Sequence, residues 1–250
     1  MAIVSTKAIV LSSLKYGDTS LIVKCYTKEE GVKTYLIRGV LKPKKKGVKA
    51  AYFQPLTQLK IVANHNSRNT LNSIKEVQVI QPYKTIHSDI IKQSVVFFLS
   101  EILASSIQEE EQNKTLYSYL ETAFIWLDVH DKISNFHLLF LLNLTGFLGF
   151  YPDISEKQKK GFNLLEGNFS DDIQDKNVIY KNDFYQFKKL LGINFDSLEN
   201  VSYSKEERQL VLQMIIQYFR LHLGSFRKPK SLQLSLIHIL LCRRLLTCRS

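Results

Sequence analysis

The sequence predicts an α+β protein in which an all-β part is followed by an all-α part. Three observations support this prediction: strand-like segments fill residues 3–80, the spacing of apolar residues becomes helical after Pro82, and most of the net positive charge lies in the first third of the chain. The chain has 250 residues, of which 45% are apolar and 23% charged, so it is long enough for two domains and is not disordered throughout. We expect these domains at residues 1–80 and 81–233.

The first part contains five segments rich in β-branched and aromatic side chains, separated by short polar turns. Residues 32–38 alternate in the way that is typical of a strand with two partly buried faces. The connection at residues 39–49 is too basic, and too interrupted by Gly and Pro, to be a strand. Five strands with such connections predict a small barrel. The expected strands are residues 3–11, 21–27, 32–38, 53–62 and 70–80.

The second part has apolar residues at helical spacing. Its third helix is apolar on nearly every side, which is typical of the central helix of a bundle, and it should end at Gly149, with Pro152 just beyond. The last helix should begin at Ser204, followed by two glutamates that suit the helix dipole. A small hairpin is expected around residues 166–168. The expected helices are residues 86–107, 116–129, 133–148, 181–191 and 204–223.

The net charge of +11 is distributed unevenly. Residues 1–80 carry 14 Lys and Arg against 4 Asp and Glu, whereas residues 81–233 carry 17 against 19. A basic part beside a nearly neutral part indicates that the first part is a polyanion-binding domain and the second part a separate domain. The alternative is a generally basic and soluble surface.

The most specific local feature is a basic loop, residues 38–49, which holds six cations in 12 residues. Flexible lysines neutralise phosphates without reading base sequence, and an aromatic side chain beside them can stack on an unpaired base. The alternative is that the nearby aromatic residues belong to the core and the loop is only solvated. The candidate DNA-binding residues are Arg38, Lys42, Lys44, Lys45, Lys46, Lys49 and Tyr35.

No motif for catalysis is present. The chain lacks a glycine-rich phosphate cradle and a G-x-S-x-G nucleophile elbow, and its six histidines have no metal-ligand spacing. His137, on an apolar helix, should be a core residue, and Cys25, within a strand, should be a small buried hydrophobe. We therefore predict no catalytic residue, no cofactor and no enzyme. A nuclease assembled from scattered carboxylates remains an alternative.

Three cysteines cannot staple a chain of this size, and the first residues lack the pattern of a secretion signal, so we expect a cytoplasmic protein. The longest apolar stretch, residues 136–150, is interrupted by polar residues and is shorter than the ~20 residues of a bilayer span. Residues 234–239 resemble the translation of a sequencing adaptor. Residues 234–250 are therefore expected to be a non-native tail, with a short amphipathic helix as the alternative.

Three groups of short segments follow one another along the chain. The first group consists of residues 7–11 (KAIVL), 16–20 (YGDTS), 25–27 (CYT), Gly31, 38–40 (RGV) and 54–56 (QPL). The second group is residues 148–153 (LGFYPD), which follow an apolar helix, and the third is residues 218–223 (YFRLHL) with residues 228–232 (KPKSL). In this order and spacing, the three groups resemble the RecO family of bacterial recombination mediators, and the resemblance covers residues 1–233.

The resemblance implies an N-terminal OB-fold barrel and a C-terminal helical domain. It also implies that the protein binds single-stranded and double-stranded DNA, anneals strands and, with RecR, helps to load RecA onto DNA coated by single-strand-binding protein. The expected place is the cytoplasm, associated with the nucleoid. Lysine–phosphate contacts do not separate DNA from RNA, so an OB-fold protein that binds RNA or the ribosome remains an alternative.

One departure from the family pattern concerns zinc. Many relatives carry two pairs of cysteines after the LGFYPD segment, where they form a zinc site, but residues 153–233 contain no Cys. The resemblance to a zinc site is therefore not carried over, and the hairpin around Phe162 and Phe169 should be held by apolar packing instead.

The end of the helical part contains four cations and no acid within residues 220–230. These cations complement the carbonyl end of the last helix, which is the simpler explanation. The resemblance implies a second one: the C-terminal tail of single-strand-binding protein is acidic and ends in an apolar side chain and a carboxylate, which requires cations beside apolar surface. The candidate residues for this peptide are Arg220, Arg227, Lys228, Lys230, Phe219 and Leu223.

Overall fold

The computed structural model describes residues 2–42, 47–66, 71–108 and 111–231. The chain forms two compact units. Of the described residues, those up to Val129 form the first unit together with residues 229–231, and those from His130 to Lys228 form the second. The tail expected to be non-native, residues 234–250, lies outside the described residues.

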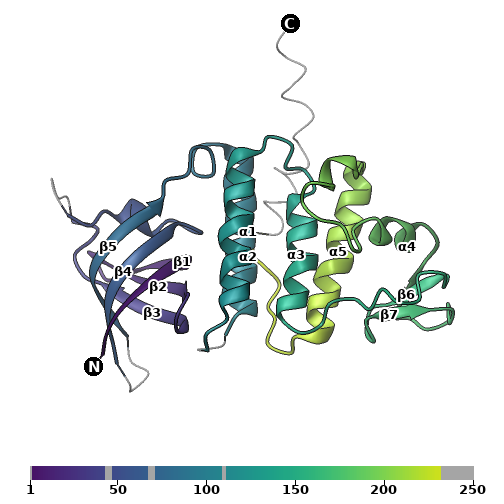
Figure 1. The fold of residues 1–250 in the computed structure, drawn as a ribbon, viewed down its shortest axis with the longest axis horizontal. Coiled ribbons are helices and arrows are strands. Elements are labelled where there is room, and N and C mark those ends of the chain that lie inside the picture. Colours follow the sequence, from purple (N-terminus) through teal and green to yellow (C-terminus); the bar gives the residue numbers. More distant parts are fainter. Residues whose placement is uncertain (1, 43–46, 67–70, 109–110, 232–250) are drawn as a thin grey trace, which may run out of the picture. The chain divides into compact units, whose positions relative to one another are not determined.

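The first unit is built on a five-stranded antiparallel sheet with the order β3-β2-β1-β4-β5 (Figure 1). A single parallel bridge from Tyr35 of β3 to Asn72, just before β5, connects the two edges. The sheet is therefore not a closed barrel, and it matches the partly open five-stranded arrangement of an OB-fold. The predicted α+β class is confirmed. The strands are β1 (Ala2–Tyr16), β2 (Ser20–Thr27), β3 (Gly31–Ile37), β4 (Gln58–His65) and β5 (Ser73–Gln81).

Two strands differ from the prediction by five residues at one end. β1 continues past a bulge at Leu11 to Tyr16, because residues 12–16 pair with β2: Val10 pairs with Cys25, and Ser12 pairs with the adjacent Lys24. β4 begins five residues later than expected because Ala50–Phe53 is a short 3₁₀ helix, η1. A one-residue insertion and a helical turn interrupt the strand pattern locally, so the apolar spacing does not reveal them.

The core of the sheet contains Cys25, which is fully buried, as predicted. Burial raises the pKa of its thiol to about 12, so the thiolate is scarce at neutral pH. The surrounding side chains are apolar. They include Ala8, Val10, Val23, Tyr35, Phe53, Leu59 and Ile61.

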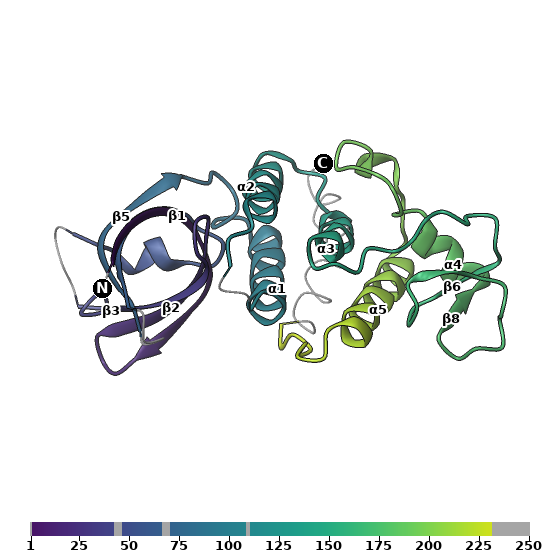
Figure 2. The same cartoon turned by 60° about the horizontal axis from the view of Figure 1, so that its bottom comes forward.

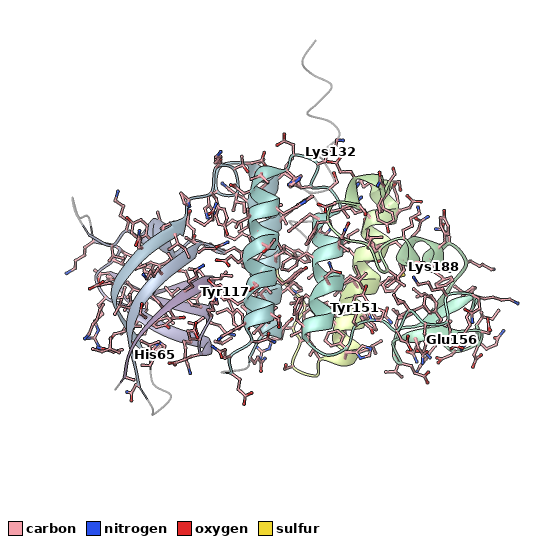
Figure 3. The ribbon with its side chains drawn as sticks, viewed as in Figure 1. His65, Tyr117, Lys132, Tyr151, Glu156 and Lys188 are labelled. Atoms are coloured by element: carbon pink, nitrogen blue, oxygen red, sulfur yellow. The ribbon has the colours of Figure 1, made fainter. Side chains whose placement is uncertain are left out.

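Two helices, α1 (Ile90–Ser106) and α2 (Lys114–Val129), belong to the same unit as the sheet. Side chains of the sheet bond to them directly: Lys24 donates to the carbonyl of Ala104 at 2.6 Å, and Lys7 pairs with Glu121 at 2.9 Å. Tyr117 of α2, labelled in Figure 3, stacks on Tyr26 of β2 with ring centroids 6.2 Å apart. The compact unit thus extends past residue 80. That residues 1–80 form a domain of their own stays a prediction.

The second unit contains α3 (Phe136–Phe147), α4 (Lys181–Lys188) and α5 (Lys205–His222), with a short 3₁₀ helix, η2 (Leu198–Asn200). Its small sheet has the strand order β7-β6-β8. In Figure 2, the labelled strands β6 and β8 lie beside α4. The predicted hairpin is confirmed, and a third strand extends it. The strands are β6 (Gly161–Asn163), β7 (Asn168–Ser170) and β8 (Val178–Tyr180).

Aromatic packing holds this hairpin, as predicted. Phe162 of β6 contacts Phe169 of β7 with ring centroids 5.6 Å apart, and it contacts Phe187 of α4 at 5.1 Å. Both phenylalanines of the hairpin are at most 2% exposed. Among the described residues, no group of three or more His, Cys, Asp or Glu side chains is placed to hold a metal ion.

The helix ends follow local chemistry. Ser204 caps α5 by accepting a bond from the N–H of Glu207, whose carboxylate accepts one from the N–H of Ser204 in return. Gly149 takes a φ of 85° just after α3, where a side chain would be strained. Within the described ranges, no helix has the length and apolar character needed to cross a membrane.

The second and third groups of family-like residues pack against each other. The hydroxyl of Tyr218 donates to the carbonyl of Phe150 at 2.8 Å, and the Phe150 ring lies parallel to that of His222 at 5.1 Å. A Cβ at Gly167 would lie 2.6 Å from the Tyr218 hydroxyl, so only glycine fits there without a shift of Tyr218. These residues are therefore structural: they hold the chain after α3 against α5.

Candidate nucleic-acid interface

The candidate interface begins where β3 ends. Arg38, Lys42 and Lys49 are all exposed, while Lys44, Lys45 and Lys46 lie outside the described residues. Gly39 takes a φ of 65°, which turns the chain out of the sheet. The N–H of Leu41 donates to the carbonyl of Thr19 at 2.9 Å, so the start of the basic loop is anchored to the β1–β2 turn.

Charge complements this geometry. Residues 31–75 contain ten Lys and Arg and no Asp or Glu. Lys60 on β4 and Lys75 on β5 are exposed, as are the three described cations of the loop. A continuous run of chain with one sign of charge attracts phosphates.

Tyr35 is placed differently from the other candidates. Its side chain is fully buried in the core of the sheet, so neither face of its ring is open to a base. Its hydroxyl lies 2.8 Å from Nε2 of His65, and Nδ1 of His65 lies 2.5 Å from the carboxylate of Glu30. Burial raises the pKa of Tyr35, and the nearby Cys25 and Glu30 add to this effect. Tyr35 therefore supports the sheet, and we leave it out of the proposed contact surface.

A cavity of about 480 Å³ lies beside the loop, between the edges of β3 and β5. It exists because the bonding between these edges stops at Asn72, whose N–H donates to Thr34 and whose carbonyl accepts from Leu36. Beyond this bridge, the two strands are not paired. The lining residues are Leu36, Ile37, Arg38, Val40, Val48, Leu71, Asn72, Ser73 and Ile74.

The sequence reasoning identified Arg38 and missed the rest of this cavity. Its walls come from three parts of the chain that only the fold brings together: residues 36–38 with Val40, then Val48, then residues 71–74. Leu71 is 44% exposed although it is apolar. The sequence contains one signal for this cavity, an isolated leucine directly after a polar segment. The same leucine is equally typical of the first residue of a strand.

The candidates for peptide binding are divided between the units. Lys230 lies in the first unit, and the other five lie in the second. Arg220, Arg227 and Lys228 are exposed, and Leu223 is half-buried. Phe219 is fully buried, with Phe150 5.5 Å away and Phe226 5.4 Å away between ring centroids, so it supports the surface from below.

Comparisons with known proteins cover almost the whole described chain. The family model "Recombination protein O N terminal" matches residues 1–83, and "Recombination protein O C terminal" matches residues 87–233. The chain is 46% identical over 230 residues to the DNA repair protein RecO of Flavobacterium psychrophilum, covering 92% of this chain and 96% of that protein. It is 46% identical over 231 residues to that of Flavobacterium johnsoniae, covering 92% and 97%. It is 36% identical over 231 residues to that of Phocaeicola vulgatus, covering 91% and 95%.

Proposed function

Because this chain belongs to the RecO family of DNA repair proteins, we propose that it acts in repair by binding DNA through the basic loop and the adjacent edge of its five-stranded sheet. The observation that carries the proposal is the exposed cationic surface around Arg38, Lys42 and Lys49, within a segment that contains no acid. Lysine and arginine contacts to phosphate supply affinity that does not depend on base sequence. No chemical step is proposed.

We propose further that the protein anneals complementary strands. With RecR, it would help RecA to load onto DNA that is coated by single-strand-binding protein. A mediator of this kind must bind DNA of any base sequence, and contacts from flexible cations to the DNA backbone meet that need. The direct test is to mix complementary strands coated with single-strand-binding protein and to follow duplex formation with and without this protein. A rate that does not change would contradict the annealing role. Competition by RNA of equal length reports which nucleic acid is preferred.

Replacing Lys44, Lys45 and Lys46 by alanine should weaken binding to all DNA sequences about equally. The plot of log affinity against log salt should become shallower by roughly 2 units for single strands, since each lost phosphate contact removes about 0.7. Fluorescence anisotropy at several salt concentrations measures this slope.

The matched control replaces three other lysines by alanine, namely Lys84, Lys114 and Lys176, which are all exposed and lie outside the acid-free segment. These changes remove the same formal charge and should leave the slope nearly unchanged. If the two triple variants lose the same slope, overall charge governs binding, and the basic loop has no particular role.

For the helical unit, we propose an acidic-peptide site at the end of α5. Arg220 lies in the last turn of the helix, with Arg227 and Lys228 shortly after it, and all three are exposed. Leu223 and Phe226 are half-buried between these cations. Cations beside partly exposed apolar side chains suit a peptide that ends in an apolar residue and a carboxylate, as the tail of single-strand-binding protein does.

Arg220→Glu combined with Lys228→Glu should reduce affinity for that tail peptide at least tenfold, because two attractive charges become repulsive. DNA binding by the first unit should be largely retained. Isothermal titration with the peptide and anisotropy with DNA measure the two affinities on one protein.

The control double variant is Lys176→Glu with Lys205→Glu, two exposed lysines of the same unit. It changes the net charge equally and should not affect peptide binding. Peptide affinity that survives Arg220→Glu with Lys228→Glu, or that falls equally in both double variants, would remove the case for a specific site on α5.

A further inference from the structure

We propose that the cavity between β3 and β5 receives one unpaired nucleobase of a bound DNA strand. This inference rests on the proposed function and adds a ligand class to it. The cavity of about 480 Å³ is large enough for a base together with part of its sugar, and it lies directly beside the exposed cations of the basic loop.

The walls have the chemistry that a base requires. Leu71, Ile74 and Val48 supply apolar surface from three parts of the chain. Leu71 is exposed, and the other two are half-buried, so the apolar atoms are reachable from solvent. Flipped-out bases are held between aromatic or apolar side chains, which replace the stacking that the base loses when it leaves its neighbours.

The open edge of β3 supplies polar groups. Leu36 donates its N–H to Asn72, away from β2, and the alternation of an antiparallel ladder directs the carbonyl of Leu36 and the N–H of Arg38 to the same side. The β3–β5 bonding ends at Asn72, so these two groups face the cavity. Ser73 adds an exposed hydroxyl on the opposite edge. One acceptor, one donor and one hydroxyl can pair with the edge of any base.

Arg38 joins the cavity to the phosphate path. It lines the cavity, and it is also the first cation of the basic loop. A strand whose phosphates follow Arg38, Lys42 and Lys49 would therefore have one base within reach of the cavity. In a duplex, that base must first leave its pair, which costs a few kcal/mol. The cavity thus favours single strands over duplexes, whereas the lysines alone do not.

The test compares two oligonucleotides of about ten nucleotides, a length within the range bound by one OB-fold. One is oligothymidylate, and the other has the same backbone without bases. The wild-type protein should bind the abasic strand at least about five-fold more weakly, the lower end of what one stacked base contributes. Leu71→Ala should weaken binding of oligothymidylate by a similar factor and leave abasic binding unchanged. Its salt slope should equal that of the wild type.

Leu41→Ala is the matched control. Leu41 is 37% exposed beside Lys42, close to the 44% of Leu71, but it does not line the cavity, so its removal should have no effect. Ser73→Leu narrows the cavity from the other edge and should reproduce the effect of Leu71→Ala. It therefore keeps the test valid if Leu71→Ala folds poorly.

The possible failures are distinguishable. Equal binding of both oligonucleotides by the wild-type protein, or equal losses on both in the variants, overturns the base pocket while the proposed DNA binding stands. If the wild-type protein binds neither oligonucleotide, the proposed function fails, and the base pocket fails with it.

Discussion

Replacing Asp128 by alanine should lower the free energy of unfolding of the first unit by about 3–5 kcal/mol, because the carboxylate holds three buried or partly buried backbone donors at once. Asp128 is 4% exposed at the end of α2. Its oxygens accept from the N–H groups of Lys84 at 2.9 Å, Thr85 at 2.8 Å and Ile86 at 3.1 Å. Alanine leaves these donors without an acceptor.

The same residue also organises the start of α1. Thr85 donates its hydroxyl to the carbonyl of Asp128 at 2.6 Å, and the buried Lys92 donates to that carbonyl at 2.9 Å. Burial by itself would raise the pKa of Asp128, but the backbone donors outweigh it and hold this pKa below its usual value. The carboxylate form therefore contributes stability at neutral pH, and this contribution is lost only as the pH falls below about 3.8.

Chemical denaturation followed by circular dichroism measures the loss. Asp128→Asn keeps the shape and one acceptor oxygen, so its loss should be about half that of Asp128→Ala. Asp131→Ala is the control, since Asp131 is an exposed aspartate three residues away, and its removal should cost less than about 0.5 kcal/mol. If Asp128→Ala lowers the free energy of unfolding no more than Asp131→Ala does, then water bonds the three N–H groups in place of the carboxylate, and Asp128 has no special role in stability.

The second large effect concerns His137 of α3, which is 1% exposed, as predicted for a core histidine. Burial, with a smaller contribution from the charge of Arg208, lowers its pKa to about 3. In the unfolded chain, the same side chain titrates near 6.5. Between pH 6.5 and pH 3, the unfolded state therefore binds a proton that the folded state does not. Stability should fall by about 1.4 kcal/mol for each pH unit below 6.5.

The measurement is the free energy of unfolding at pH 7.5, 6, 5 and 4.5, for the wild-type protein and for His137→Leu. The leucine variant has no proton to gain, so below pH 6.5 its slope should be smaller by about 1.4 kcal/mol per pH unit. All four points lie above the window in which Asp128 loses its contribution. The free energy of unfolding of His137→Leu at pH 7.5 shows whether this variant folds as the wild-type protein does. Parallel slopes for the two proteins would show that His137 is not the group responsible.

The sequence by itself determined the elements whose signals are local. The end of α3 near Gly149 and the start of α5 at Ser204 follow from residues within one turn of each other, since capping bonds and positive φ values involve only neighbours in the chain. The burial of Cys25 and His137 also follows from local patterns, because each lies within an apolar run that must be covered on all sides. Membership in the RecO family could likewise be recognised from short segments in a fixed order.

Tertiary structure decided which aromatic residues are available to a ligand. Tyr35 lies on a strand whose alternation suggests two partly buried faces, and its ring could have faced either way. The bridge between β3 and Asn72 places this ring in the core of the sheet. There, its hydroxyl bonds to His65, which in turn bonds to Glu30. Burial depends on which strands become neighbours, and strand order is a long-range property that periodicity does not contain.

The cavity and the hydrogen bonds of Asp128 both depend on residues that are far apart in the chain. Leu36 and Leu71 are 35 positions apart in the chain, and Asp128 is more than 40 residues from the backbone groups that it caps. The composition of the basic loop could be read directly, so its cations were predictable. The apolar pocket beside them could not be predicted, because it is the gap left where two edge strands stop pairing, and only the register of the assembled sheet defines where that gap lies.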